Sequence, residues 1–402
     1  MKKPIVPILL GGDLNAYGMA AAFYEAGVFP SYALGRYRLG VTAHSRFIRQ
    51  VIDGRMESDE GRLALLYEVA AHHPDSAFIV LGCTDEYASF LVRSRSRLDG
   101  RFILPSPPPE ALSYADKAIF ARTMHERGIR VPRTVVLSEG EAVPESVPFC
   151  YPAVLKPAVS EDYWHAPFPA MRKVWFPDTR AAAEETVRRI RQAGYRGGLL
   201  LQERIPASDT DNGVLTVYCD RRARATAAVY GRVLLEEHTP RGLGNHAAIL
   251  TAPPPPVSEA LVAFLEEIGY RGFANFDLLA DPHGGEPYVL EMNLRQGRSN
   301  QYMLAAGCNP AALILADRVA GAEPPCIYSK SEVVWHSVPL SLVEAGLPEG
   351  ELLDHVRRLV AAGRSVSALG HRADLRKNLW RRLFLWEHER RIRKRAGATA
   401  TP

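Results

Sequence analysis

The sequence predicts an α/β protein that is built from several domains. Apolar strand-like runs alternate with helix-period stretches through the first hundred residues, and this alternation is typical of a parallel sheet with right-handed crossovers. The chain has 402 residues, which is more than one ordinary domain contains. Proline-rich breaks at 105–109 and 253–256 mark changes in its organisation.

Each expected element follows from its local hydrophobic pattern. Before the first break we expect strands at Ile5–Leu10, Ser31–Leu34 and Phe78–Leu81, and helices at Met19–Ala26, Leu63–Ala71 and Tyr87–Arg93. Between the breaks we expect helices at Asp116–Arg127 and Arg180–Ala193, and strands at Arg133–Leu137, Pro152–Lys156, Leu199–Glu203, Val214–Asp220 and Ala225–Leu235, the last two antiparallel. After the second break come helices at Ser258–Gly269, Gln301–Ala306 and Pro310–Ala320, and two strands, Gly272–Ala280 and Pro287–Asn293.

Composition indicates a protein of a reducing compartment. The five cysteines are odd in number and widely spaced, and none lies in a CxxC, which argues against a disulfide framework or a zinc site. The apolar run that begins at Met1 is cut short by Gly11-Gly12-Asp13, so we interpret it as a buried strand and not as a signal peptide. We therefore expect a cytoplasmic protein. A net charge of +4 is small for this length and gives no indication of nucleic-acid binding.

Two neighbouring strands carry an acidic cluster. Side chains alternate along a strand, so Asn275 and Asp277 share one face, as do Glu291 and Asn293. A turn centred near His283–Gly285 places Asp277 opposite Glu291. Such carboxylates repel unless a cation lies between them, and hard oxygen ligands suit Mg²⁺. The pattern predicts a magnesium site at Asp277, Glu291 and Asn293. The alternative is a pair of solvated acids on an exposed sheet face.

Two lysines favour the first interpretation. Lys156 closes the apolar run that starts at Ala153, and a lysine ending a buried strand is unusual unless its ammonium group meets an anion. Lys117 opens the helix that follows the first proline-rich break. The alternative for Lys117 is an ordinary surface lysine.

The order of these features resembles the ATP-grasp ligases. The motifs are Asp116-Lys117, Gly128-Ile129-Arg130-Val131-Pro132, a strand ending Lys156-Pro157, the strand Leu199–Ile205, and Asp277 followed by Glu291-x-Asn293-x-Arg295. Within that superfamily the chain is most similar to the D-aspartate ligases of peptidoglycan synthesis, through Leu10–Asp13, Tyr17–Ala20, Leu81–Asp85 and Gly297–Tyr302.

The resemblance implies an ATP-grasp architecture in four parts. These would be an N-terminal parallel α/β domain (1–110), a central small α+β lid domain (111–205), a C-terminal α+β domain with an antiparallel sheet and the metal site (206–328), and an appended unit with a basic tail (329–402).

The resemblance also implies roles for individual residues. Lys117 and Lys156 would contact the α- and β-phosphates of ATP, and Arg295 would face the transferred γ-phosphate. Asp277, Glu291 and Asn293 would hold Mg²⁺. The hinge would read adenine through the backbone of Gln202, Glu203, Arg204 and Ile205, and the side chain of Glu203 would contribute only if it turned inward. Asp209 or Asp211 would bind the ribose, and the sequence does not distinguish between them.

A departure from many ATP-grasp enzymes lies in the segment 159–174, which contains no glycine where a glycine-rich flap is common. The D-aspartate ligase group uses a Ser/Tyr/Lys version, so Ser160 and Lys173 are candidate flap contacts. The alternative for Lys173 is a solvated strand residue.

The expected amino-acid site is less sharply marked. Arg298 and Ser299 precede a helix, and a helix N-terminus beside an arginine can bind a carboxylate, although a plain N-cap by Ser299 or Asn300 is the alternative. Gly12 and Asp13 follow the first strand, where open parallel sheets bind ligands. The chain lacks GxGxxG and GxxxxGK[ST], so dinucleotide binding and a P-loop are not expected.

The C-terminal tail is basic. Between Arg372 and Arg395 it has ten Lys/Arg against three acids, with two tryptophans interleaved. This pattern fits an amphipathic helix on the inner, anionic face of a membrane, and the alternative is a helix packed on the body of the protein.

The implied activity is an ATP-dependent ligase that activates a carboxylate as an acyl phosphate and joins it to an amine. The resemblance favours D-aspartate as the acid and a side-chain amine of a peptidoglycan precursor as the acceptor. The alternatives are an ATP-grasp ligase for another amino acid and a nucleotide-binding regulatory protein without turnover. The oligomeric state is not predicted.

Overall fold

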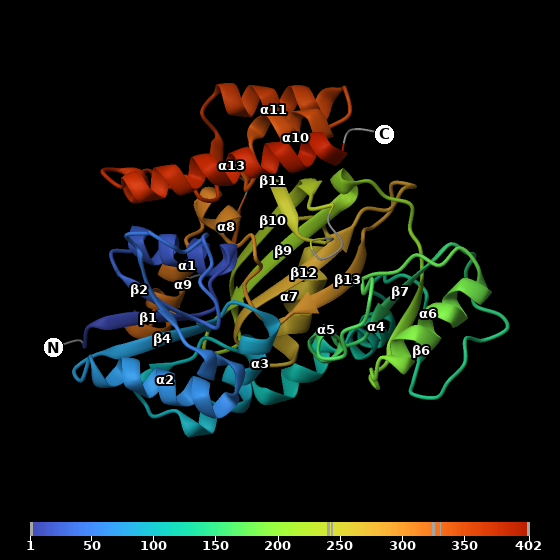
Figure 1. Cartoon of the computed structure of the whole chain (residues 1–402), viewed down its shortest axis with the longest axis horizontal. Coiled ribbons are helices and arrows are strands. Elements are labelled where there is room, and N and C mark those ends of the chain that lie inside the picture. Colours follow the sequence, from blue (N-terminus) through green and yellow to red (C-terminus); the bar gives the residue numbers. More distant parts are fainter. Residues whose placement is uncertain (1–2, 239–241, 243, 324–325, 330, 400–402) are drawn as a thin grey trace.

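Three β-sheets organise the chain. The computed structural model describes residues 3–399 except 239–241, 243, 324, 325 and 330 (Figure 1). The N-terminal sheet is fully parallel in the order β3-β2-β1-β4-β5, formed by β1 (Ile5–Leu10), β2 (Ser31–Gly35), β3 (Ile48–Ile52), β4 (Ala77–Gly82) and β5 (Phe102–Ile103). Helices α1 (Leu14–Glu25), α2 (Asp59–Ala71) and α3 (Asp85–Arg93) accompany it. The predicted parallel α/β arrangement is confirmed, but β3 and β5 were not predicted from the sequence.

A small sheet follows. It runs antiparallel in the order β6-β8-β7, made of β6 (Thr134–Leu137), β8 (Leu199–Glu203) and β7 (Ala153–Pro157). Helix α6 (Arg180–Gln192) buries Val187 and Ile190 in the same apolar cluster as Leu155, and the short helix α5 (Ser160–Trp164) follows β7. Figure 1 shows this unit at one side of the molecule, apart from the N-terminal sheet.

The large sheet has eight strands. Along its main path they are β13 (Tyr288–Asn293), β12 (Gly272–Leu279), β9 (Asn212–Cys219), β10 (Ala225–Glu236), β11 (His246–Ala252), β15 (Val334–His336) and β16 (Ser365–Ser367), and β14 (Ile327–Tyr328) pairs with β10. The antiparallel pairing of β9 with β10 and the hairpin of β12 with β13 agree with the sequence prediction. Helices α4 (Lys117–Glu126) and α7 (Val257–Glu267) contribute Phe120 and Phe264 to the core beneath this sheet.

The C-terminal residues do not form a sheet of their own. Strands β15 and β16 extend the large sheet. The helical elements after β13 are α8 (Gln301–Ala305), α9 (Pro310–Ile314), a π-helical turn (Leu315–Ala320), α10 (Leu340–Gly346), α11 (Glu351–Ala361), α12 (Arg372–Leu375) and α13 (Leu379–Thr399). Short 3₁₀ turns lie earlier in the chain, at Gly54–Glu57, Arg95–Arg97, Pro109–Ala115 and Asp209–Asp211. Helix α13 crosses the top of the molecule (Figure 1). The four-part division at residues 110, 205 and 328 remains our proposal. Within the described residues, no helix has the length and apolarity needed to cross a membrane.

Candidate active site

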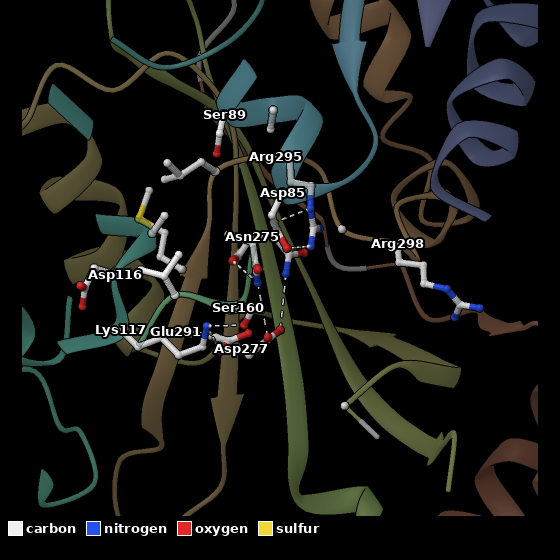
Figure 2. Close-up of a pocket in the computed structure, with 18 of the residues that line it drawn as sticks. Asp85, Ser89, Asp116, Lys117, Ser160, Asn275, Asp277, Glu291, Arg295 and Arg298 are labelled. Carbon is white, nitrogen blue, oxygen red and sulfur yellow. Dashed lines mark hydrogen bonds and ion pairs between the residues drawn. The ribbon is translucent and has the colours of Figure 1, made fainter. Parts of the chain in front are cut away.

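The β12–β13 hairpin forms the centre of the site. Its register pairs Asp277 with Glu291, as the sequence predicted, and also Asn275 with Asn293. Asp277 receives one amide N–H on each carboxylate oxygen: Asn275 Nδ2 lies 3.4 Å from Oδ1 and Asn293 Nδ2 lies 3.4 Å from Oδ2. Figure 2 shows Glu291 reaching the same point from the neighbouring strand. The alternative, a pair of solvated acids on an exposed sheet face, does not agree with the Glu291 side chain, which is only 16% exposed.

Asn275 is a site residue that sequence reasoning did not assign. It is 4% exposed and lies in a chain of hydrogen bonds in which Tyr302 donates to Thr216 (2.8 Å), Thr216 donates to Asn275 (2.9 Å), and Asn275 donates to Asp277. This chain fixes the orientation of the Asp277 carboxylate. The alternation of side chains along the strand already placed Asn275 on the same face as Asp277, and this could have identified it as a site residue.

Three lysines surround the acidic pair. Lys117 Nζ lies 3.3 Å from Glu291 Oε2 and 3.2 Å from the Ser160 hydroxyl (Figure 2). Lys156, at the end of β7, and Lys173 both act electrostatically on Glu291. Three ammonium groups against two carboxylates leave a surplus of positive charge, which suits a polyphosphate.

Burial and these charges shift the pKa values of the cluster. Burial, and after it the neighbouring Glu291, raises the pKa of Asp277 to about 8. Burial opposes ionisation of Glu291 as well, but Lys117, Lys173 and Lys156 together bring its pKa below the ordinary value. Burial lowers the pKa of Lys156 to about 8, because its ammonium group has lost most of its water.

The acidic pair fits a hard divalent cation. Two largely buried carboxylates share one site, burial and the neighbouring Glu291 raise the pKa of Asp277, and a cation placed between the two would remove their repulsion. Carboxylate and amide oxygens from Asp277, Glu291 and Asn293 are the ligand types that Mg²⁺ takes, with phosphate and water completing its shell.

Two cavities meet at this pair. The first, about 310 Å³, lies between the small and large sheets and is lined by Lys156, Gln202, Ile205 and apolar side chains that include Val154 and Leu290. The second, about 510 Å³, extends toward the N-terminal sheet and is lined by Arg295, Arg298 and Ser299. Lys117, Ser160, Lys173, Asp277 and Glu291 line both cavities.

The Glu203 carboxylate of the hinge strand β8 already has a protein partner. It accepts hydrogen bonds from the Arg133 guanidinium at 2.6 and 2.9 Å. Gln202 also bonds within the small sheet, to Thr134 at 2.8 Å. Arg204 lies over the Phe176 ring at 5.3 Å. With its carboxylate paired to Arg133, Glu203 would contact adenine through its backbone, which stays a prediction.

The structure does not bring Asp209 or Asp211 into either cavity. Asp209 accepts the Glu236 N–H and the His238 ring nitrogen, both at 2.8 Å, and Asp211 caps its own turn through Ser208. Both carboxylates stabilise the loop before β9. Their short separation from the hinge in the sequence does not show which way their side chains point. Besides Glu203 and the acidic pair, the described acids that line the first cavity include Glu236.

The arginines of the second cavity already have protein partners. Arg295 Nε lies 2.7 Å from Asp85 at the start of α3, and Arg298 Nη1 lies 2.8 Å from Glu237. In Figure 2 the Arg298 guanidinium points away from the acidic pair. Ser299 is buried at the cavity wall. The N-cap position of α8 belongs to Asn300, although the Asn300 side chain makes no capping hydrogen bond.

Gly12 and Asp13 lie at the entry to α1. Asp13 caps this helix, accepting the N–H of Asn15 at 3.1 Å, and neither residue is among the described residues that line the two cavities. Burial raises the pKa of Asp13, and Arg298 and Arg295 oppose the shift, so Asp13 contributes to the field around these arginines.

The glycine-free flap folds over the junction of the cavities. Ser160 begins α5, and the Tyr163 hydroxyl donates to the Arg172 carbonyl at 3.0 Å, which joins the two ends of the segment. Lys173 lines both cavities, so it is not an isolated solvated residue. Trp164 lies at the wall of the second cavity.

Known proteins share this fold and sequence. The chain is 31% identical over 333 residues to a D-aspartate ligase of Enterococcus faecium, covering 79% of this chain and 77% of the relative. An L-amino acid ligase of Bacillus licheniformis matches 78% of this chain and 74% of its own at a TM-score of 0.54 and 15% identity. The biotin carboxylase domain of a Hydrogenobacter thermophilus 2-oxoglutarate carboxylase, solved with MgADP, matches 82% and 72% at a TM-score of 0.58 and 15% identity. No protein-family model matches.

The structural likenesses establish the fold, and the sequence likeness over most of both chains establishes the relationship. They agree with the order of motifs, the lysine-ringed acidic hairpin and the two joined cavities described above. The chain is an ATP-dependent carbon–nitrogen ligase and belongs to the D-aspartate ligase family of ATP-grasp carboxylate–amine ligases.

Proposed function

We propose that this ligase joins D-aspartate to a side-chain amine of a peptidoglycan precursor in the cytoplasm, with ATP and Mg²⁺. The observation that carries the proposal is the pair of cavities that meet at Asp277 and Glu291, one with an apolar wall and one lined by three arginines, Arg93, Arg295 and Arg298. The first has the character of a nucleobase site, and the second that of a site for an anionic amino acid.

In this proposal the chain holds ATP by its charge surplus. Lys117, Lys156 and Lys173 bind the phosphates, the hinge backbone from Gln202 to Ile205 contacts the adenine, and Ser160 bonds a phosphate oxygen from the flap. Asp277, Glu291 and Asn293 hold Mg²⁺, which neutralises phosphate charge during transfer. Glu236 replaces Asp209 and Asp211 as the candidate for the ribose hydroxyls, because it lines the cavity.

The coupling proceeds in two steps. A carboxylate oxygen of the amino acid attacks the γ-phosphorus as the bond to the β-phosphate oxygen breaks, giving an acyl phosphate and ADP. The neutral amine then attacks the acyl carbon, the carbon–oxygen bond to phosphate breaks, and the nitrogen loses a proton. Arg295 lies beside Asp277 and stabilises the transferred phosphoryl charge, while the flap keeps water from the acyl phosphate.

Recognition of a diacid requires a second cation site. Arg298 is 32% exposed and held by Glu237, so an incoming carboxylate would exchange with Glu237 for its bidentate donors. This partner is also the observation that favours the second candidate, a ligase for an amino acid without a side-chain carboxylate, because Arg298 would then stay with Glu237.

A panel of amino acids in an ATP-hydrolysis assay tests the proposal, run with and without a lysine-containing peptidoglycan precursor. D-aspartate should give ADP, phosphate and an amide product. Arg298→Ala should raise the KM for D-aspartate by about tenfold or more and leave that for ATP within about twofold, since one charge-assisted contact is worth ~1.5–3 kcal/mol. A product that carries another amino acid would refute D-aspartate as the substrate, but it would leave the assignment as a ligase unchanged.

A further inference from the structure

Helix α13 buries one arginine and exposes two tryptophans. The Arg381 side chain is fully buried, 3.2 Å from Asp374, and donates to the carbonyls of Val41 (2.6 Å) and Ala43 (3.2 Å). The outward side carries large apolar residues, with exposures of 76, 66, 49 and 60% for Leu379, Trp380, Leu383 and Trp386. A soluble helix normally buries its tryptophans and exposes its arginines, so the outward face of α13 requires an explanation.

This orientation is held by specific contacts. The Arg381 guanidinium lies 4.4 Å from the centre of the Tyr17 ring. The Phe384 ring packs so closely on Gly40 that a Cβ there would lie 2.5 Å from it. The N-terminal domain therefore fixes which side of the helix faces outward, and the sequence-based alternative of an apolar stripe packed on the body is wrong for the two tryptophans.

The outward residues form one stripe with a cationic surround. Their spacing of i, i+1, i+4 and i+7 places them on one side of an α-helix. The exposed residues that accompany or follow them are basic: Arg382, Arg390, Arg391, Arg393 and Lys394.

An open hollow of about 490 Å³ adjoins the start of the stripe, lined by His44, Arg46, Lys377, Asn378 and Trp380. His44 (φ 59°) and Lys377 (φ 55°) both have left-handed backbone conformations that non-glycine residues rarely adopt. The Asn378 amide donates to the His44 carbonyl at 2.7 Å and ties the two strained positions together. Such strain, when it is held in place by neighbouring contacts, is common at ligand sites.

We propose that α13 and this hollow form a docking surface for an anionic lipid bilayer. Tryptophan rings prefer the headgroup level of a bilayer, the leucines enter the acyl boundary, and the arginines meet anionic headgroups. The hollow, with Arg46 and Lys377, receives a lipid phosphate. Two copies of such a basic face would repel each other, and nucleic acid would leave the apolar stripe in water. The surface is independent of which amino acid the enzyme activates.

Flotation of the full-length protein with vesicles tests the surface. We expect binding to vesicles that contain about 30% phosphatidylglycerol, weaker binding at high salt, and almost no binding to vesicles of phosphatidylcholine alone. Tryptophan emission should shift to the blue when the protein binds. Trp380→Ala/Trp386→Ala should abolish the blue shift and lower partitioning at least about tenfold. ATP turnover without vesicles should not change in any variant.

Matched charge reversals separate the surface from net charge. Arg391→Glu/Arg393→Glu alters side chains that are 68 and 57% exposed, each in one ion pair, and should lower partitioning about tenfold or more. Arg196→Glu/Arg222→Glu alters side chains 70 and 58% exposed, also each in one ion pair, and should bind as the parent does. Equal losses in both pairs, equal binding to neutral vesicles, binding of RNA in preference to vesicles, or a dimer that the tryptophan variants abolish would each overturn the proposal.

Discussion

Replacing Lys156 with Met is expected to stabilise the ligand-free protein while removing its affinity for ATP. Burial lowers the pKa of Lys156 from 10.5 to about 8, a difference of about 2.5. Each pKa unit corresponds to about 1.4 kcal/mol, so the charged side chain costs the fold roughly 3 kcal/mol at neutral pH. Since the residue is only 9% exposed, solvent does not screen this penalty. Methionine fills similar space without a charge.

The pH dependence has a definite sign. The pKa of Lys156 is lower in the folded state than in the unfolded chain, so the penalty is complete below pH 8 and shrinks as the pH rises toward 10.5. Urea unfolding at pH 7 should therefore show Lys156→Met more stable than the parent by roughly 3 kcal/mol, and at pH 9.5 by about 2 kcal/mol less than that. Saturating ATP should stabilise the parent and leave the variant unchanged.

Lys117→Met is the matched control. Lys117 is the direct partner of Glu291 at 3.3 Å and its side chain is 11% exposed. Its loss leaves a buried carboxylate with less compensation, so this variant should be destabilised. A Lys156→Met protein that unfolds more easily than the parent at pH 7, or that still gains stability from ATP, would refute the reasoning.

Three further substitutions test the site. Glu291→Gln should lower turnover by about a hundredfold or more without loss of fold, most clearly at limiting Mg²⁺, because a metal ligand is removed; near-parent rates would remove Glu291 from the metal site. Glu203→Ala should change the ATP Kd less than about threefold, measured by calorimetry, since its carboxylate faces the exposed Arg133 and such pairs contribute ~0–1 kcal/mol; a tenfold loss would place that carboxylate on the nucleotide. Asn275→Ala should lower the free energy of unfolding by about 2 kcal/mol, because it leaves buried Thr216 and Asp277 with unpaired groups; a urea midpoint equal to the parent's would contradict the hydrogen-bond chain.

Local periodicity explains which elements could be predicted. The strand Leu199–Glu203 has the predicted bounds because all its apolar side chains are buried in the middle of a sheet. Strand β3 was missed because only its first residue, Ile48, is buried, so its sequence carries almost no pattern. Strand β11 (His246–Ala252) has a buried centre, but its sequence is rich in alanine. Such a sequence does not favour a strand over a helix.

The order of motifs and the pairing of Asp277 with Glu291 could be predicted from the sequence, because a short turn and a period-two pattern place the two carboxylates opposite each other. The register shift between Asp277 and Leu278, which pairs Leu278 with Val289, was decided by the tertiary structure. The partners of the charged side chains were decided only by the tertiary structure. Glu203 bonds an arginine 70 residues away, and Arg295 bonds an aspartate 210 residues away. Electrostatic partners depend on distance in space, and neither spacing along the chain nor composition contains that distance. The outward face of α13 was decided in the same way, by the buried contacts of Arg381 with the N-terminal domain.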